Sequence, residues 1–141
     1  MTLIIDAAPV VAMADRNDPI GKSVLDILEQ ESGDLIVPAP VSAEIDYLLG
    51  VRLGRASRLA FLDDCAAGRF TVSGLTRAEH GTVRDLEQQF ADLDAGLADL
   101  SVVVLAHRYG TRRVLTFDQR DFRVLRLPGG DPLTLLPYDA P

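Results

Sequence analysis

The chain alternates short, wholly apolar segments with longer segments of helical periodicity. Leu3-Ile4-Ile5 and Leu35-Ile36-Val37 are too short and too apolar to form amphipathic helices, so both are interpreted as buried strands. Phe70-Thr71-Val72 and Val114-Leu115-Thr116 continue the series, and residues 133–136 are a candidate fifth strand. Strands that alternate with helices predict an α/β fold, a three-layer α/β/α sandwich around a mainly parallel sheet of four to five strands.

The segments between these strands carry apolar residues at helical spacing. Helices are expected just after Asp6 and over residues 20–31, 41–53, 57–65, 76–90 and 97–109. In the fourth of these, Leu59, Leu62 and Ala66 are expected to face inward. Residues 102–104 are β-branched, but about a dozen residues between the preceding loop and Gly110 favour a buried helix over a strand.

Length and composition limit the class of protein. With 141 residues, 48% of them hydrophobic and 25% charged, the chain is expected to form one globular domain over residues 1–141. No apolar run reaches the roughly 18 residues of a membrane-spanning helix, and the first residues do not resemble a signal peptide. The single cysteine, Cys65, fits a reducing compartment, so a cytoplasmic protein is expected.

Four acidic residues lie where a short apolar segment ends and a loop or helix begins. Asp6, Glu44, Asp99 and Asp118 are separated by 38, 55 and 19 positions. In an open parallel sheet, ligands bind outside the carboxyl ends of the strands, so these distant side chains are expected to converge there. Asp15, Asp46, Asp94 and Asp121 are the acids most easily confused with this set, or auxiliary to it.

Converging carboxylates repel one another and resist full ionisation unless a cation neutralises them. Carboxylate oxygens suit hard ions, so the set predicts a site for Mg²⁺ or Mn²⁺. A bound ion of this kind supports hydrolysis of a phosphodiester by acidifying a water molecule and by relieving charge on the phosphate.

Other chemistries find less support. His80 and His107 lack metal-ligand spacing, and no serine lies in a Gly-x-Ser-x-Gly elbow. Asp6 after a strand is compatible with a phosphatase or receiver domain, but Ala8 stands where such phosphatases have a second acid. The only lysine is Lys22, and no lysine follows the fourth strand. A non-catalytic interaction module that uses the same groove is a further alternative.

The charge distribution restricts how the protein meets nucleic acid. Fourteen basic against 21 acidic residues give a net charge of −7, which argues against a broad nucleic-acid-binding surface. Arginine suits bidentate phosphate contact, and Arg112, Arg113 and Arg120 flank the strand that leads to Asp118. These three are therefore the candidates for a local RNA-binding rim, with the stretch Arg52, Arg55 and Arg58 as the next choice.

Four blocks of the sequence, in order and over essentially the whole chain, resemble a PIN domain, and more narrowly the VapC toxins of bacterial VapBC toxin–antitoxin pairs. The blocks are residues 3–6, 38–44, 97–106 and 114–122, which read LIID, PAPVSAE, LADLSVVVLA and VLTFDQRDF. Any one block is weakly specific, whereas four in the right order and spacing are strongly so. One departure is Leu100, where the family usually has a small residue.

The resemblance implies a magnesium-dependent endoribonuclease that acts as a toxin, forms a homodimer and is inhibited by a VapB-type antitoxin. It implies that Asp6 and Asp99 are direct metal ligands, and that Glu44 and Asp118 act through metal-bound water or hold a second ion. Thr116 matches a position that hydrogen-bonds a carboxylate in related proteins. The homodimer is expected to meet through the helices between about residues 41 and 70.

Overall fold

A parallel sheet runs through the centre of the molecule in the computed structural model, which describes residues 1–140. Pro141, the last residue of the predicted domain, lies outside the described residues. Within residues 1–140 the sheet has five strands: β1 (Leu3–Ile5), β2 (Leu35–Pro38), β3 (Thr71–Ser73), β4 (Arg113–Leu115) and β5 (Thr134–Leu136). Their order is β3-β2-β1-β4-β5, and every neighbouring pair is parallel. The predicted α/β architecture is therefore confirmed.

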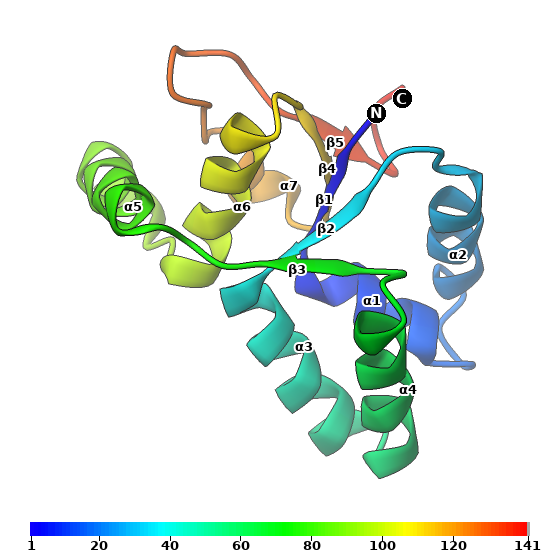
Figure 1. Cartoon of the computed structure of the whole chain (residues 1–141). Coiled ribbons are helices and arrows are strands. Elements are labelled where there is room, and N and C mark those ends of the chain that lie inside the picture. The colour runs from blue at the N-terminus through cyan, green and yellow to red at the C-terminus, as the bar shows by residue number, and fades with distance from the viewer. Residues whose placement is uncertain (141) are drawn as a thin grey trace.

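Helices cover both faces of this sheet. They are α1 (Ala7–Ala14), α2 (Gly21–Gln30), α3 (Ala39–Arg52), α4 (Arg55–Ala66), α5 (Arg77–Gln89), α6 (Leu97–Arg108) and the one-turn α7 (Gln119–Phe122), with a 3₁₀ turn, η1, over Ala91–Leu93. Figure 1 shows α5 and α6 on one side of the sheet, α1 and α2 on the other, and the α3–α4 pair below. No helix among residues 1–140 is long and apolar enough to cross a membrane.

The core lies where the central strands meet α6. Leu3, Ile4 and Ile5 of β1 are completely buried because the strand has neighbours on both edges and helices on both faces. Residues 102–106 of α6 are likewise at most 2% exposed. This all-round burial explains the β-branched run, and the prediction of a buried helix here is confirmed.

Three details of the sequence interpretation are wrong. β3 and β4 are each displaced by one residue from their predicted bounds, so Thr116 follows β4 instead of ending it. The short helix α7 was not anticipated, because four residues are too few to show a period. Leu59, Leu62 and Ala66 do not face inward: all three are exposed, the two leucines at 41% and 44%, and Phe61 fills the core instead. α4 packs chiefly on α3, so only a narrow face of it is covered.

Candidate active site

Asp6 is held in place where β1 gives way to α1. It caps α1: its Oδ1 accepts the backbone N–H of Ala7 at 2.9 Å. Its own backbone N–H donates to the carbonyl of Leu115 at 2.9 Å, which fixes the end of β1 against the end of β4. The residue is 8% exposed, so this carboxylate is almost completely buried next to the core.

Thr116 connects two of the predicted acids. Its buried hydroxyl donates to Oδ2 of Asp6 at 2.7 Å, and its oxygen accepts the backbone N–H of Asp118 at 3.1 Å. The expected hydrogen bond from Thr116 to a carboxylate is thus confirmed. Asp118 in turn caps α7, because its Oδ1 accepts the backbone N–H of Asp121 at 3.0 Å. The two acids that follow strands are therefore positioned by one shared hydroxyl.

Glu44 and Asp99 come from helices that pack on each other. Glu44 lies in the second turn of α3 and is exposed, whereas Asp99 lies in the first turn of α6 and is partly buried. The expectation that a strand precedes each acid is wrong for Asp99, which follows η1 and a loop. Its place near the others comes from the contact of α6 with α3 and β1.

The electrostatics of these side chains show that they are close neighbours. Burial, followed by repulsion from Asp6, Asp118, Glu44 and Asp121, raises the pKa of Asp99 to about 6. Burial also raises the pKa of Asp6, against the hydrogen bonds from Thr116 and Ala7, and the charge of Asp118 adds to the increase. Burial and the charge of Asp6 raise the pKa of Glu44. The structure therefore brings Asp6, Glu44, Asp99 and Asp118, hereafter the acidic quartet, into one electrostatic unit.

No side-chain cation among the described residues pairs with these carboxylates. Among residues 1–140, none of the ion pairs includes a member of the acidic quartet. In that part of the chain, no group of three or more His, Cys, Asp or Glu side chains is arranged so that it could hold a metal ion. The donor chemistry nevertheless fits a hydrated Mg²⁺ or Mn²⁺, because Mg²⁺ commonly takes one or two carboxylates and keeps several waters.

The arginines expected near the acids are divided between the two edges of the sheet. Arg112 and Arg113 lie at the amino end of β4, whereas Asp118 lies beyond its carboxyl end. Arg113 forms an ion pair with Glu31, and Arg112 lies 3.4 Å from Asp131. Their expected closeness to the acidic quartet is therefore wrong, because a strand of three residues places about 10 Å between its ends. Arg120 of α7 is exposed, two residues from Asp118, and makes no ion pair within residues 1–140.

The other candidate acids have different surroundings. Asp15 accepts the backbone N–H of Asn17 at 2.9 Å in the turn after α1, and Asp46 lies 3.4 Å from Arg58. Asp94 is exposed in a turn, with a positive φ of 52°. Asp121 alone among these alternatives contributes to the raised pKa of Asp99. It is the acid next to the quartet that sequence spacing could name only as a possible auxiliary.

The fold and the acidic edge define a class of protein, the PIN-like α/β/α domains. Two solved structures share this fold at 14% identity. VapC20 from Mycobacterium tuberculosis, described as a sarcin–ricin loop cleaving toxin, has a TM-score of 0.76 over 84% of this chain and 91% of its own. VapBC2 from Rickettsia felis, bound to a DNA fragment from its promoter, has a TM-score of 0.70 over 96% and 98%. FitAcB from Neisseria gonorrhoeae, 15% identical, has a TM-score of 0.59 over 83% and 88%.

Sequence similarity narrows this class. No protein-family model matches the chain. Ribonuclease VapC26 of Mycobacterium tuberculosis (strain ATCC 25618 / H37Rv) is 35% identical over 135 residues, which cover 96% of this chain and 100% of the relative. The chain belongs to the VapC family of PIN-domain proteins, as the four sequence blocks predicted.

Proposed function

We propose that this protein is a metal-dependent endoribonuclease and the toxin of a type II toxin–antitoxin pair. The observation that carries the proposal is the acidic quartet at the carboxyl edge of the sheet: burial and the charges of neighbouring members raise the pKa of Asp6, Glu44 and Asp99, and no member forms an ion pair within residues 1–140. Such a cluster is unfavourable by itself and becomes favourable when a divalent cation binds. Its relative VapC26 is named a ribonuclease, which agrees in reaction class.

Asp6 and Asp99 would hold Mg²⁺ or Mn²⁺ directly, with Glu44 and Asp118 acting through bound water or on a second ion. When bound, the ion would acidify a water molecule and stabilise the charge that develops on the reacting phosphate. The assignment of Asp6 rests on its fixed position, since both carboxylate oxygens are oriented by hydrogen bonds from Ala7 and Thr116. Each of these oxygens keeps a further lone pair for a ligand.

The other acids of the quartet would handle protons and water. Oδ1 of Asp118 accepts the N–H of Asp121, and the remaining lone pairs of this carboxylate would accept hydrogen bonds from water. Glu44 is exposed and has a raised pKa, which suits a carboxylate that accepts a proton from the attacking water. Asp99, with a pKa of about 6, is mostly ionised at neutral pH and therefore available as a ligand.

RNA would approach this edge through local positive charge, because the net charge of the protein is −7. Arg120 supports this approach, because it is exposed, lies two residues from Asp118 and makes no ion pair among residues 1–140. Arg112 and Arg113 are engaged at the other edge. We assign the phosphate contact nearest the quartet to Arg120.

A VapB-type antitoxin would inhibit the protein by covering the acidic edge with its C-terminal segment. A guanidinium placed there would pair with carboxylates that form no ion pair within residues 1–140, and charge-assisted hydrogen bonds of this kind are strong. The homodimer would form through α3 and α4. Four large apolar side chains on these helices, Tyr47, Val51, Leu59 and Leu62, are between 41% and 63% exposed, which supports this face as the contact.

The experiment that tests the reaction is cleavage of RNA by the purified protein. Activity is expected with Mg²⁺ or Mn²⁺, none with EDTA, and recovery when the divalent ion is returned in excess. The addition of a cognate VapB-type antitoxin should inhibit. Cleavage that continues undiminished in EDTA would overturn the metal-dependent mechanism, and absence of cleavage of every RNA class under saturating metal would overturn the nuclease.

A further inference from the structure

The one-turn helix α7 carries two side chains that the proposed reaction uses. Asp118 is its N-cap, and Arg120 lies within it. Four residues are too few to form a stable helix alone, since isolated helices shorter than about 12 residues are marginal in water. Phe122 anchors α7 in the core and is 1% exposed, but a single buried side chain does not fix the rotation of a helical turn. The positions of Asp118 and Arg120 therefore depend on further contacts at the ends of α7.

Both ends of α7 are fixed by side-chain hydrogen bonds. At the amino end, the backbone N–H of Asp118 donates to the hydroxyl of Thr116. At the carboxyl end, Arg123 is the C-cap, and its guanidinium donates to both carboxylate oxygens of Asp139 at 2.7 Å each, a contact called the fork below. The same guanidinium donates to Oε1 of Gln119, the first residue of α7, at 3.1 Å. One arginine thus connects the beginning and the end of the helix to Asp139.

Asp139 is itself held beside β5. Its Oδ2 accepts the backbone N–H of Leu135 at 2.7 Å, and its own backbone N–H donates to the carbonyl of Leu135 at 2.7 Å. Hydrogen bonds from Arg123 and from the N–H of Leu135 lower the pKa of Asp139 to about 2, so the carboxylate is charged at neutral pH. Because β5 pairs with β4, the fork connects α7 to the sheet.

The fork differs from an ordinary surface ion pair. Exposed pairs contribute little when two flexible side chains must be ordered for one contact. Here Leu135 already orients Asp139, and Gln119 orients Arg123. A bidentate contact between arginine and a carboxylate also has a defined geometry. The side chains of Arg123 and Asp139 are only 41% and 29% exposed. Such a contact is suited to orient the segment that carries it.

We propose that Arg123 and Asp139 are positioning residues of the active site: the fork holds α7 in the orientation that brings Asp118 and Arg120 to the acidic edge. The roles of these last two residues rest on the proposed nuclease function, whereas the fork itself is testable in the metal-free protein. Arg123 and Asp139 act through α7 and do not contact metal or RNA. Loss of the fork should leave the fold intact and loosen α7.

Amide hydrogen exchange of the isotope-labelled, metal-free protein tests the fork directly. In Asp139→Asn and in Arg123→Gln, the protection factors of the N–H groups of Asp121 and Val124 should fall about two- to fivefold. The amides of residues 102–106 should not change. Both variants break the same contact, so the double variant should be no worse than the more severe single one. Unchanged protection of α7, or additive effects of the two changes, would overturn the proposal.

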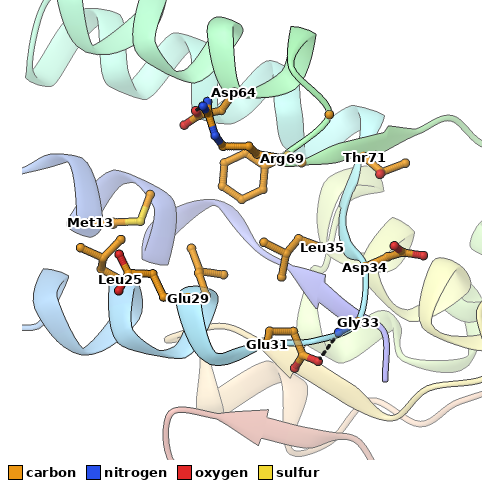
Figure 2. Close-up of a pocket in the computed structure, with 13 residues that line it drawn as sticks. Met13, Leu25, Glu29, Glu31, Gly33, Asp34, Leu35, Asp64, Arg69 and Thr71 are labelled. Carbon is orange, nitrogen blue, oxygen red and sulfur yellow. Dashed lines mark hydrogen bonds and ion pairs between the residues drawn. The ribbon is translucent and has the colours of Figure 1, made fainter.

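Asp64→Asn is the matched control. Arg69 and Asp64 form a pair of nearly the same length, 2.6 Å, and the side chain of Asp64 is 33% exposed. Figure 2 shows this pair beside a hollow at the end of α4, near the amino end of β3 and thus away from the acidic edge. The control should leave the protection of α7 unchanged. If Asp64→Asn loosens α7 as much as Asp139→Asn does, the loss of charge acts through the whole fold and the proposal fails.

Binding measurements connect the fork to the active site. Asp139→Asn should weaken Mn²⁺ binding, and RNA binding measured in EDTA, by up to about tenfold. In an Arg120→Ala background, Asp139→Asn should weaken RNA binding less than in the wild type, because part of its effect passes through Arg120. Loosened α7 with unchanged affinities would overturn the positioning role. A wild type that binds neither Mn²⁺ nor RNA would overturn the proposed function, and hydrogen exchange would still decide whether the fork holds α7.

Discussion

The hydroxyl of Thr116 lies 2.7 Å from Oδ2 of Asp6 and donates a hydrogen bond to it. The same oxygen accepts the backbone N–H of Asp118, so one buried side chain fixes acids that are 112 positions apart. Partners that orient metal-binding carboxylates commonly change metal affinity or activity 10–100-fold. Thr116→Val should therefore lower RNA cleavage by about that factor.

Thr116→Ser is the control for this prediction, because it keeps the hydroxyl and removes only a methyl group. It should retain most of the activity, measured as initial rates at saturating Mn²⁺. Loss of activity in both variants, with the fold intact by circular dichroism, would show that packing and not the hydrogen bond is important at this position.

Removal of a metal-binding carboxylate should abolish the reaction. Asp6→Asn and Asp99→Asn keep the side-chain shape but remove the charge, and the loss of several kcal/mol of transition-state stabilisation corresponds to at least about 100-fold in rate. Asp15→Asn and Asp94→Asn change acids outside the quartet and should retain nearly full activity. Normal turnover by Asp6→Asn would refute the assignment of the site.

The raised pKa of Asp99 predicts how stability depends on pH. The folded protein holds a proton on this carboxyl up to a pKa of about 6, above its ordinary value of 3.8, so it binds more protons than the unfolded chain between these values. Stability then falls as pH rises through this interval. The melting temperature of the metal-free protein should decrease less between pH 4 and pH 7 for Asp99→Asn than for the wild type. An identical pH profile in the two proteins would contradict the shift.

The same ionisation predicts metal binding that depends on pH. A carboxylate must lose its proton to coordinate a cation, so Mn²⁺ affinity should fall as pH decreases through about 6. Isothermal titration calorimetry at pH 5, 6 and 7.5 measures this directly and requires no RNA. An affinity that is constant over this range would argue against Asp99 as a ligand.

The arginine positions predict a division of roles. In an inactive Asp99→Asn background, Arg120→Ala should weaken RNA binding and flatten its salt dependence by roughly one unit per lost phosphate contact. Arg113→Ala should leave the salt slope unchanged and destabilise the fold by about 1–3 kcal/mol, because it removes the guanidinium partner of Glu31, whose side chain is 5% exposed and keeps only the amino-terminal ammonium and the N–H of Gly33. A flatter slope for Arg113→Ala alone would reverse this assignment.

The exposed apolar face predicts the assembly. Leu62→Glu puts a charge in place of one of the four exposed apolar side chains of α3 and α4, and should convert the proposed dimer into a monomer, measured by light scattering at micromolar concentration. Val124→Glu changes an apolar residue that is also partly exposed, at 47%, but lies beyond α7, and should leave the dimer intact. A wild type that remains monomeric in this assay would contradict the proposed dimer.

The sequence by itself determined most of the local structure and was sufficient to name the four acids of the acidic quartet. Apolar triplets predict β1 and β2, because a strand that is covered on both faces needs apolar side chains at successive positions. The Thr76–Glu79 capping box marks the start of α5. The four sequence blocks, in their order and spacing, were also enough to predict the family. The observed bounds of β3 and β4 differ by one residue from the predicted bounds, because a three-residue strand has too few positions to define a period.

Only the tertiary structure decided which distant residues meet. Arg113 and Arg120 flank Asp118 in sequence, but one lies at the amino edge of the sheet with Glu31 and the other at the acidic edge. Leu59 and Leu62 match a helical pattern, but which face of α4 is covered depends on how α3 packs against it. The periodicity of apolar residues indicates which positions of a single helix or strand are expected to be buried. Periodicity does not show how the strands are oriented in the sheet. That orientation places Arg113 and Asp118 at opposite edges.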